Sequence, residues 1–307
     1  MDTFLYIVIN IILPIFFLIA VGFIGQTKLK MDIRTFTKLN IYIFVPSVLF
    51  LKIYETNVTF EFFSQVLVYI FIIQVVMLLL GQLISKAFGY SRSIKKAFCN
   101  SLLFFNSGNY GLPLVELVFN GDPVAVASQV FIMLIQNVTT NTFGVFQASS
   151  GNSTTKKALK NILKMPSIYV ILLVIAVKTF HITMPELILV PLGYIAKGFI
   201  AIALITLGAQ LSEMKIKIKL RDILLSSLTR LVLSPLLGFL LVWVMGIRGV
   251  LAQALVIGVS TPSAVNTAFI AKEFDNEPEY ASQIVFVSTI MSALTISLVI
   301  YLTGMLL

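Results

Sequence analysis

Charged residues are scarce in this chain. Asp, Glu, Lys and Arg make up only 11% of its 307 residues, while hydrophobic residues make up 58% and the mean hydropathy is +1.00. Soluble domains carry about 25% charged residues, so the composition excludes an ordinary soluble protein. We expect an all-α polytopic membrane protein, because helices satisfy their own backbone hydrogen bonds in lipid.

Cysteine and histidine each occur once, as Cys99 and His181. A single cysteine excludes an intrachain disulfide and a thiolate metal cluster, and a single histidine cannot build a histidine metal site or a catalytic triad. We therefore expect no metal, no other cofactor and no enzymatic activity. A P-loop sequence is also missing, which excludes an ATP-driven pump of the ABC type.

Acidic residues are outnumbered by basic ones, and the net charge is +9. Such an excess can indicate nucleic-acid binding, but the basic residues lie in short loops between apolar runs, where they set orientation. We expect no nucleic-acid partner. Seventeen of the 22 basic residues lie in alternate loops: Lys28, Lys30, Arg34, Lys38, Lys86, Arg92, Lys95, Lys96, Lys156, Lys157, Lys160, Lys164, Lys215, Lys217, Lys219, Arg221 and Lys272. These loops are expected in the cytoplasm, which leaves both termini of a multi-pass cytoplasmic-membrane protein outside.

Apolar segments follow one another along the whole chain. We predict ten transmembrane helices at about 4–25, 34–53, 61–85, 93–119, 122–148, 164–182, 187–212, 222–246, 249–272 and 279–306. The residues before the first segment, Met1-Asp2-Thr3, lack a basic n-region. We therefore interpret that segment as a span and not as a signal peptide.

The fourth segment is unusual at its centre. Two apolar runs, 97–105 and 112–119, are each too short to cross a bilayer. Two asparagines, a serine and two glycines lie between them, and Pro113 lies at the start of the second run. Irregular backbone at this depth is tolerated only against protein or a water-filled cavity. The pattern predicts a broken helix of the kind that forms solute sites in secondary transporters. A kink used only for packing remains the alternative at this point.

The two halves of the chain resemble each other weakly. The tripeptide Ala-Ser-Gln opens the fifth segment at 127–129 and the tenth at 281–283, and prolines lie at Pro14 and Pro166. We predict a five-helix repeat over 1–148, a cytoplasmic linker over 149–163 and a second repeat over 164–307. Five spans per repeat would make the second half inverted. The ninth segment, partner of the fourth, should then also be broken, and 259–268 contains Pro262, hydroxyls and Asn266.

Several motifs together resemble the auxin efflux carrier family. They are Asn-Ser-Gly-Asn-Tyr-Gly-Leu-Pro-Leu at 106–114, Leu-Gly-Ala-Gln-Leu at 207–211, Thr-Pro at 261–262, Ala-Lys-Glu-Phe at 271–274 and Pro278. That family includes the plant PIN auxin exporters and bacterial permeases proposed for malate or malonate. The large cytoplasmic loop of many plant members is missing here, so regulation through that loop is not carried over.

The resemblance implies a specific architecture. It implies scaffold helices 1, 2, 6 and 7, transport helices 3–5 and 8–10, and crossing broken helices 4 and 9. It also implies elevator-type movement and a homodimer joined through the scaffolds. The expected partners are thus a small organic anion, membrane lipid and a second copy of the chain.

A carboxylate is the expected substrate, because helix N-termini favour anions. We expect the half-helices to begin at Pro113 and near Pro262, where the missing N–H of proline would have no partner anyway. Asn109 matches the crossing-point asparagine of the family motif. The candidate substrate-binding residues are Asn106, Ser107, Asn109, Tyr110, Pro113, Gln136, Asn137, Thr140, Pro262, Ser263 and Asn266. For the polar set at 136–141, interhelical hydrogen bonding is an equal alternative.

Ionisable residues inside the predicted spans are few. Glu116 is a candidate for proton coupling, unless it lies close enough to the outer surface to be solvated. Arg230 and Lys197 lie within about two turns of a span end and are expected to extend to the interface. The coupling ion is left open between a proton, sodium and none, because carbonyl and hydroxyl oxygens can also bind sodium.

The leading hypothesis is therefore a secondary carrier for a small organic anion. One alternative is a membrane sensor or binding protein for a lipid or metabolite, although no soluble signalling domain is present in these residues. Another is a sodium-coupled symporter of the bile-acid type, which uses equivalent crossing helices.

Overall fold

The protein is described here by a computed structural model that covers residues 3–56, 59–149, 163, 165–214 and 220–307. Apart from one isolated β-bridge, the secondary structure of these residues is helical. The predicted linker at 149–163 lies almost entirely outside the described residues. The elements are α1 (Thr3–Ile7), η1 (Val8–Ile12), α2 (Leu13–Leu29), α3 (Ile33–Leu39), η2 (Asn40–Phe44), α4 (Val45–Glu55), α5 (Phe60–Ala87), α6 (Arg92–Leu103), η3 (Ser107–Gly111), α7 (Leu112–Val118), α8 (Pro123–Thr139), η4 (Thr140–Gly144), α9 (Val145–Ala148), α11 (Pro166–Thr179), α12 (Glu186–Ser212), α13 (Leu220–Leu228), η5 (Thr229–Leu233), α14 (Ser234–Val244), α15 (Gly249–Val259), α16 (Val265–Glu273) and α17 (Pro278–Leu306).

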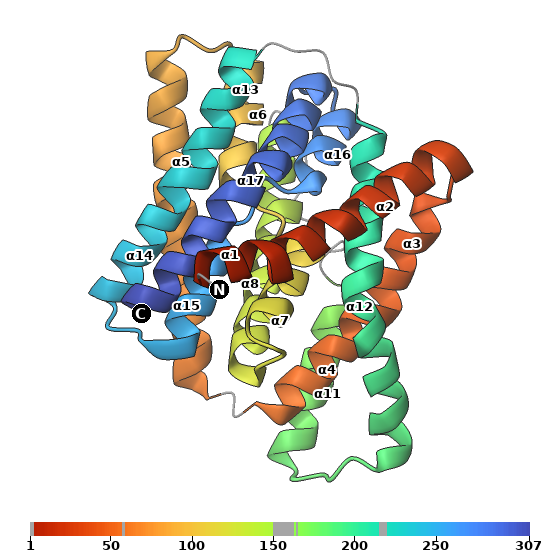
Figure 1. Cartoon of the computed structure of the whole chain (residues 1–307). Coiled ribbons are helices and arrows are strands. Elements are labelled where there is room, and N and C mark those ends of the chain that lie inside the picture. Colours follow the sequence, from red (N-terminus) through yellow and green to blue (C-terminus); the bar gives the residue numbers. More distant parts are fainter. Residues whose placement is uncertain (1–2, 57–58, 150–162, 164, 215–219) are drawn as a thin grey trace.

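Helices occupy every apolar segment that the sequence predicts (Figure 1). Among the described residues, seven helical stretches are long and apolar enough to cross a membrane unaided. Three predicted spans are shorter or interrupted: α11, the α6–α7 stretch and the α15–α16 stretch. The chain is a multi-pass, all-helical membrane protein.

Proline explains most of the irregular turns inside these helices. Four of the π-helical turns end two residues before a proline, namely Pro14, Pro46, Pro113 and Pro235. Proline has no N–H to donate, and its ring collides with the carbonyl group four residues earlier. A π-helical turn widens the helix at that point, so the helix continues through the proline without ending.

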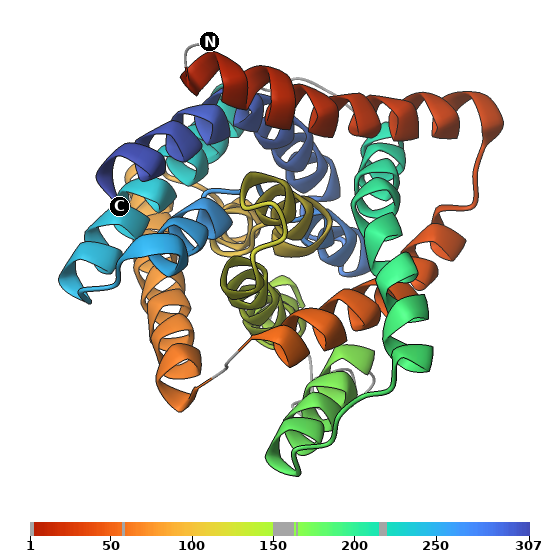
Figure 2. The ribbon, with the colours of Figure 1, turned by 60° about the horizontal axis from the view of Figure 1, so that its bottom comes forward.

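Two groups of helices lie side by side (Figures 1 and 2). In one group, α2 packs along α12, and α4 packs against α11 and α12. In the other, α5, α6, α8 and α13 to α17 pack on one another. The stretch η3–α7 lies between the groups and contacts both α8 and α12.

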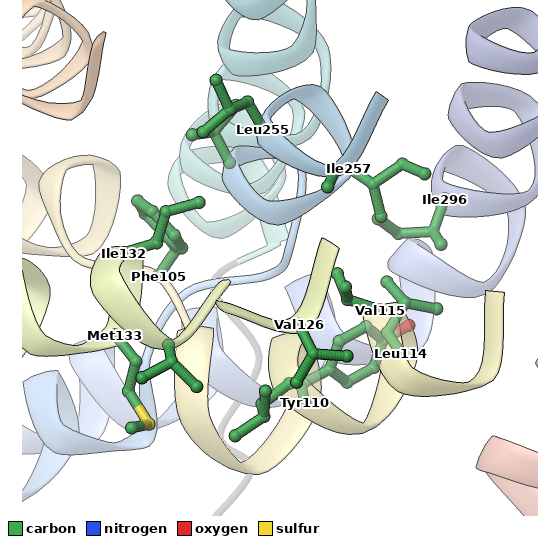
Figure 3. Packing of buried hydrophobic residues seen from close by; sticks show 14 of the residues in the cluster. Phe105, Tyr110, Leu114, Val115, Val126, Ile132, Met133, Leu255, Ile257 and Ile296 are labelled. Atoms are coloured by element: carbon green, nitrogen blue, oxygen red, sulfur yellow. The ribbon is translucent and has the colours of Figure 1, made fainter. Parts of the chain in front are cut away.

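Apolar side chains fill the space around this central stretch. Figure 3 shows Tyr110, Leu114 and Val115 close to Val126 of α8, while Ile257 of α15 and Ile296 of α17 approach from the other side. All six side chains are fully or almost fully buried. The interruption in the α6–α7 stretch is therefore surrounded by protein, as irregular backbone in a membrane must be unless it meets water.

Candidate functional site

The α6–α7 stretch is interrupted at residues 104–106, where the motif at 106–114 begins. The helix α6 ends at Leu103, and helical structure resumes at Ser107. The second half-helix thus begins six residues before Pro113, so the expectation that Pro113 occupies its first position is wrong. The π-helical turn η3 accommodates the missing proline N–H inside the helix instead.

The α15–α16 stretch is interrupted at residues 260–264. The helix α15 ends at Val259, and α16 begins at Val265 after Ala264 in an extended conformation. Pro262 therefore lies inside the interruption rather than in the helix that follows it. Both interruptions expected from the sequence are present.

The two interruptions cross and pair with each other. The backbone N–H of Asn106 donates to the carbonyl group of Pro262 at 2.8 Å, and the N–H of Ala264 donates to the carbonyl of Phe104 at 3.0 Å. These bonds form an antiparallel bridge between Phe105 and Ser263. Each broken segment satisfies the backbone of the other, which removes the cost of unpaired polar groups in an apolar environment.

Arg230 of η5 supports this crossing from behind. Its side chain is fully buried, and its guanidinium group donates to the carbonyl groups of Leu102, Val259 and Thr261. Its Cζ atom also lies 4.5 Å from the centre of the Phe105 ring. The expectation that Arg230 extends to the membrane interface is therefore wrong. The carbonyl groups at the ends of α6 and α15 hold the side chain inside the protein.

A cavity of about 450 Å³ lies on the other side of the crossing, between the two groups of helices. Its wall includes residues 107–109 at the start of η3, and residues 264–266, which are the N-cap and first two residues of α16. The first N–H groups of a helix have no partner within the helix and carry its positive dipole end. Two helix N-termini therefore face one space.

Amide side chains dominate the polar part of the cavity wall. Of these, Asn106 is only 7% exposed, and its Nδ2 group has no hydrogen-bond partner. The Oε1 atom of Gln136 is likewise buried and unpartnered. A buried amide donor without a partner is costly, so a ligand that accepts a hydrogen bond from Asn106 would stabilise the site.

The model of one protein family, described as "Membrane transport protein", matches residues 7–300 of this chain. This match covers nearly the whole sequence. The chain belongs to the membrane transport protein family. It is the family of the auxin efflux carriers that the motifs at 106–114 and 207–211 indicated. As a member, the protein is a membrane transporter and not an enzyme.

Two archaeal members of the membrane transport protein family are similar to this chain. An uncharacterized transporter of Methanocaldococcus jannaschii is 24% identical over 302 residues, covering 94% of this chain and 96% of the relative. An uncharacterized transporter of Methanothermobacter thermautotrophicus is 32% identical over 107 residues, covering 35% of each chain. The first alignment extends over both groups of helices.

Most of the candidate residues in this family member lie at the cavity. Seven of them line it: Asn106, Ser107, Asn109, Gln136, Asn137, Thr140 and Asn266. Asn109 also crosses to the other helix group, since it accepts a hydrogen bond from Asn40 at 2.8 Å and donates to Gln210 at 3.4 Å. Asn109 thus connects η3 with η2 and α12.

The other four candidates lie away from the cavity wall, and two of them, Pro262 and Ser263, belong to the crossing. Tyr110 is buried, and its hydroxyl group accepts a hydrogen bond from Ser292 at 3.0 Å. Ser263 donates from its hydroxyl group to the carbonyl of Ser101 at 2.8 Å. Pro113 is buried inside α7, and Pro262 provides the carbonyl group that accepts from Asn106.

Glu116 lies outside the cavity as well. Its carboxylate is 3.7 Å from the ammonium group of Lys52, which also donates to the carbonyl group of Gly121 at 3.0 Å. These contacts join the end of α4 to the end of α7. Glu116 therefore takes part in a contact between the two helix groups and does not line the cavity.

Sequence reasoning missed several residues of the cavity wall. Thr37, Asn40, Ser167, Gln210 and Glu273 all line it. Asn40 had a detectable signal, because it is an amide at the start of the apolar run 41–46. Gln210 and Glu273 lie within the motifs at 207–211 and 271–274, which pointed to the family but not to a role in the site. Thr37 and Ser167 lie near helix ends, where polar residues are ordinary and carry no signal.

Proposed function

We propose that this transporter is a secondary carrier that moves a small organic anion, a carboxylate, across the cytoplasmic membrane. One observation carries the proposal: the hydrogen-bonded crossing of residues 104–106 with 262–264, which directs two helix N-termini at one cavity. Helix N-termini at broken helices bind the anionic groups of substrates in carriers of this general design.

The charge of the cavity wall is consistent with this substrate class. The described residues that line it include no Lys, Arg or His, and one acidic residue, Glu273. Glu273 ends the nine-residue helix α16, about 12 Å from its N-terminus at a rise of about 1.5 Å per residue. An anion at the N-termini would therefore be bound by N–H and amide donors, without competition from a neighbouring carboxylate.

The two helix groups supply a mechanism of alternating access. We assign α1–α2, α3–α4, α11 and α12 to a scaffold, and the remaining helices to a transport unit that moves against it like an elevator. The cavity lies between them, so relative movement would expose it to each side in turn. This proposal keeps the ten spans in two inverted repeats, the cytoplasmic basic loops and the external termini expected from the sequence, and the homodimer joined through the scaffolds that the family resemblance implies.

Counterflow of labelled carboxylates in proteoliposomes tests the proposal. We expect at least one small carboxylate to exchange and others of its class to compete. Asn106→Ala removes the unpartnered donor and should weaken apparent affinity by about tenfold or more, as expected for a hydrogen bond to a charged group. Asn10→Ala is the matched control, because Asn10 is exposed and its amide donates only within its own helix, to Tyr6. The proposal fails if no organic anion moves or competes and the two variants behave alike.

A further inference from the structure

The buried guanidinium group of Arg230 has an unusual set of partners. Its Nη1 atom donates to the carbonyl of Leu102 at 2.9 Å, its Nε atom to that of Thr261 at 3.3 Å, and its Nη2 atom to that of Val259. All three nitrogen atoms thus donate to backbone carbonyl groups. A charge buried at this depth in a membrane protein is costly and indicates function by default.

These three carbonyl groups have a common origin. Leu102 and Val259 lie at the C-terminal ends of α6 and α15, and Thr261 lies in the interruption that follows α15. The last carbonyl groups of a helix have no partner within it and carry the negative end of its dipole. Arg230 therefore caps the first half of both broken helices, while the second halves direct their N-termini at the cavity.

Carriers with broken helices use oxygen atoms of this kind to bind a coupling cation. In them, unwound backbone carbonyl groups and half-helix C-termini coordinate sodium or a proton. Here the guanidinium group already occupies those oxygen atoms. We propose that Arg230 is a tethered cation in the position of a coupling ion, and that anion binding in the cavity therefore requires no sodium. This inference rests on the proposed anion transport.

The Phe105 side chain connects this cation with the anion site. Its ring lies 4.5 Å from the Arg230 Cζ atom, and the same residue lines the cavity. The ring face attracts the guanidinium group, which keeps its positive charge at neutral pH. In an interior of low dielectric constant, a fixed charge one side chain away from the cavity favours an anion there.

The position should accept a free cation once the side chain is removed. Truncation of Arg230 leaves the carbonyl groups of Leu102, Val259 and Thr261 facing a space of guanidinium size. Ser234 would remain in place, because its hydroxyl group donates to the Val259 carbonyl at 2.8 Å. Free guanidinium ion matches this space in shape, charge and donor geometry. It should therefore restore the positive charge and the hydrogen bonds to the three carbonyl groups that the truncation removes.

The first test compares ions and variants in carboxylate counterflow. We expect the rate of the unmodified protein to be the same in sodium, potassium and choline media. Arg230→Ala should lose about tenfold or more of this rate, as for loss of charged hydrogen bonds, and millimolar guanidinium chloride should restore it. Arg230→Lys keeps the charge and should remain active without sodium. Arg248→Ala, which truncates an exposed arginine, is the control. Its counterflow rate should depend neither on sodium nor on guanidinium.

A second readout separates this inference from the proposed function. Millimolar guanidinium chloride should raise the melting temperature of purified Arg230→Ala protein, and should not raise that of Arg248→Ala or of the unmodified protein. If no carboxylate moves in any medium, the proposed function fails while this measurement still tests the cation position. The inference is overturned if unmodified protein needs sodium, if Arg230→Ala is as active as unmodified protein, or if guanidinium stabilises all proteins equally. If Arg230→Ala fails to fold, the test is the counterflow rate of the unmodified protein and of Arg230→Lys with and without sodium. A requirement for sodium in either protein overturns the inference.

Discussion

Four of the helices have an N-cap residue whose side chain accepts a backbone hydrogen bond. Asp32, Thr59, Ser91 and Asp122 each accept a hydrogen bond from a backbone N–H group in the first turn of α3, α5, α6 and α8. These residue types are preferred at this position because their oxygen atoms satisfy an N–H group that has no partner in the helix. The residue type and its place before an apolar run are visible in the sequence.

Asp32 gives this capping a dependence on pH. The Thr35 hydroxyl group donates to its carboxylate at 2.7 Å and the Arg34 N–H at 3.0 Å, and these bonds hold the pKa of Asp32 below its ordinary value of 3.8. Because the folded pKa is lower than the unfolded one, the carboxylate stabilises the folded protein above about pH 4. That stabilisation is lost as the pH falls through the folded pKa.

We therefore expect Asp32→Ala to lower the melting temperature at neutral pH and to differ less from the unmodified protein in acid. Asp32→Asn is the control, since it keeps an accepting oxygen without a titrating group. The difference in melting temperature between Asp32→Asn and Asp32→Ala should therefore be the same at the two pH values. Thermal unfolding in detergent at two pH values measures both. A difference between Asp32→Ala and unmodified protein that is equal at the two pH values would contradict this account.

Helix pairs, at the next scale, are held by close backbone contact as well as by apolar side chains. A Cβ atom added to Gly22 of α2 would lie 2.0 Å from the carbonyl oxygen of Ile205, and one added to Gly208 of α12 would lie 1.9 Å from that of Ile19. Small residues at such contacts let membrane helices approach closely. The two glycines thus fix the α2–α12 pair.

Gly208→Ala should separate this pair at a cost of about 1–3 kcal/mol, because the colliding atoms are backbone atoms that cannot rotate away. Gly193→Ala lies in the same helix with open space around it. It should be neutral or stabilise the protein by up to about 1 kcal/mol through helix propensity. Melting temperatures of the two variants in detergent measure the difference. Equal values would show that α2 and α12 adjust without cost.

At the scale of the whole molecule, helix ends meet on one side of the described residues, and the cavity extends toward the other side. Lys178 at the end of α11 donates to the Tyr54 carbonyl at 3.0 Å, and Lys52 to the Gly121 carbonyl, so the ends of α4, α7 and α11 meet on one side. The cavity extends instead to Met165 and Glu273, at the opposite ends of their helices. In the proposed orientation, this conformation opens toward the cytoplasm.

Lys52 should stabilise this conformation, because its contacts join α4 to the α7–α8 turn across the two helix groups. Lys52→Met removes a contact of about 1 kcal/mol and should raise the minor, outward-open population about fivefold. The native cysteine, Cys99, is buried and should react little with a thiol reagent. The reaction rate of an engineered cysteine in the cavity can therefore measure the outward-open population. We expect Asn266→Cys to react about fivefold faster with an impermeant reagent added outside when Lys52→Met is also present.

Lys28→Met is the control for this measurement, since Lys28 is an exposed basic residue at the end of α2. It should leave the reaction rate of Asn266→Cys unchanged. If Lys52→Met and Lys28→Met give the same rate, the contacts at Gly121 and Glu116 do not hold the two groups together.

Local properties of the chain decided much of this structure. The length of each apolar run places the helices, because a helix forms through residues within four positions of one another. The polar residues, glycines and prolines at 106–113 and 260–266 indicate that two stretches are interrupted, although the first interruption itself lies at 104–106 and most of its motif is helical. The polar candidates Asn106, Asn109, Gln136 and Asn266 could be selected in the same way. Amides are rare inside apolar runs, and so they mark a site.

Contacts between distant residues decided the rest. The bond from Asn106 to Pro262 joins positions more than 150 residues apart, and no local pattern in either segment specifies it. The burial of Arg230 is of the same kind: position near a span end favours an interfacial side chain, yet the free carbonyl groups of two other helices offer stronger partners inside. Composition and spacing determined that there would be two broken helices in a membrane. Only their packing decided that they meet, that a cation lies behind them, and that their N-termini share one cavity.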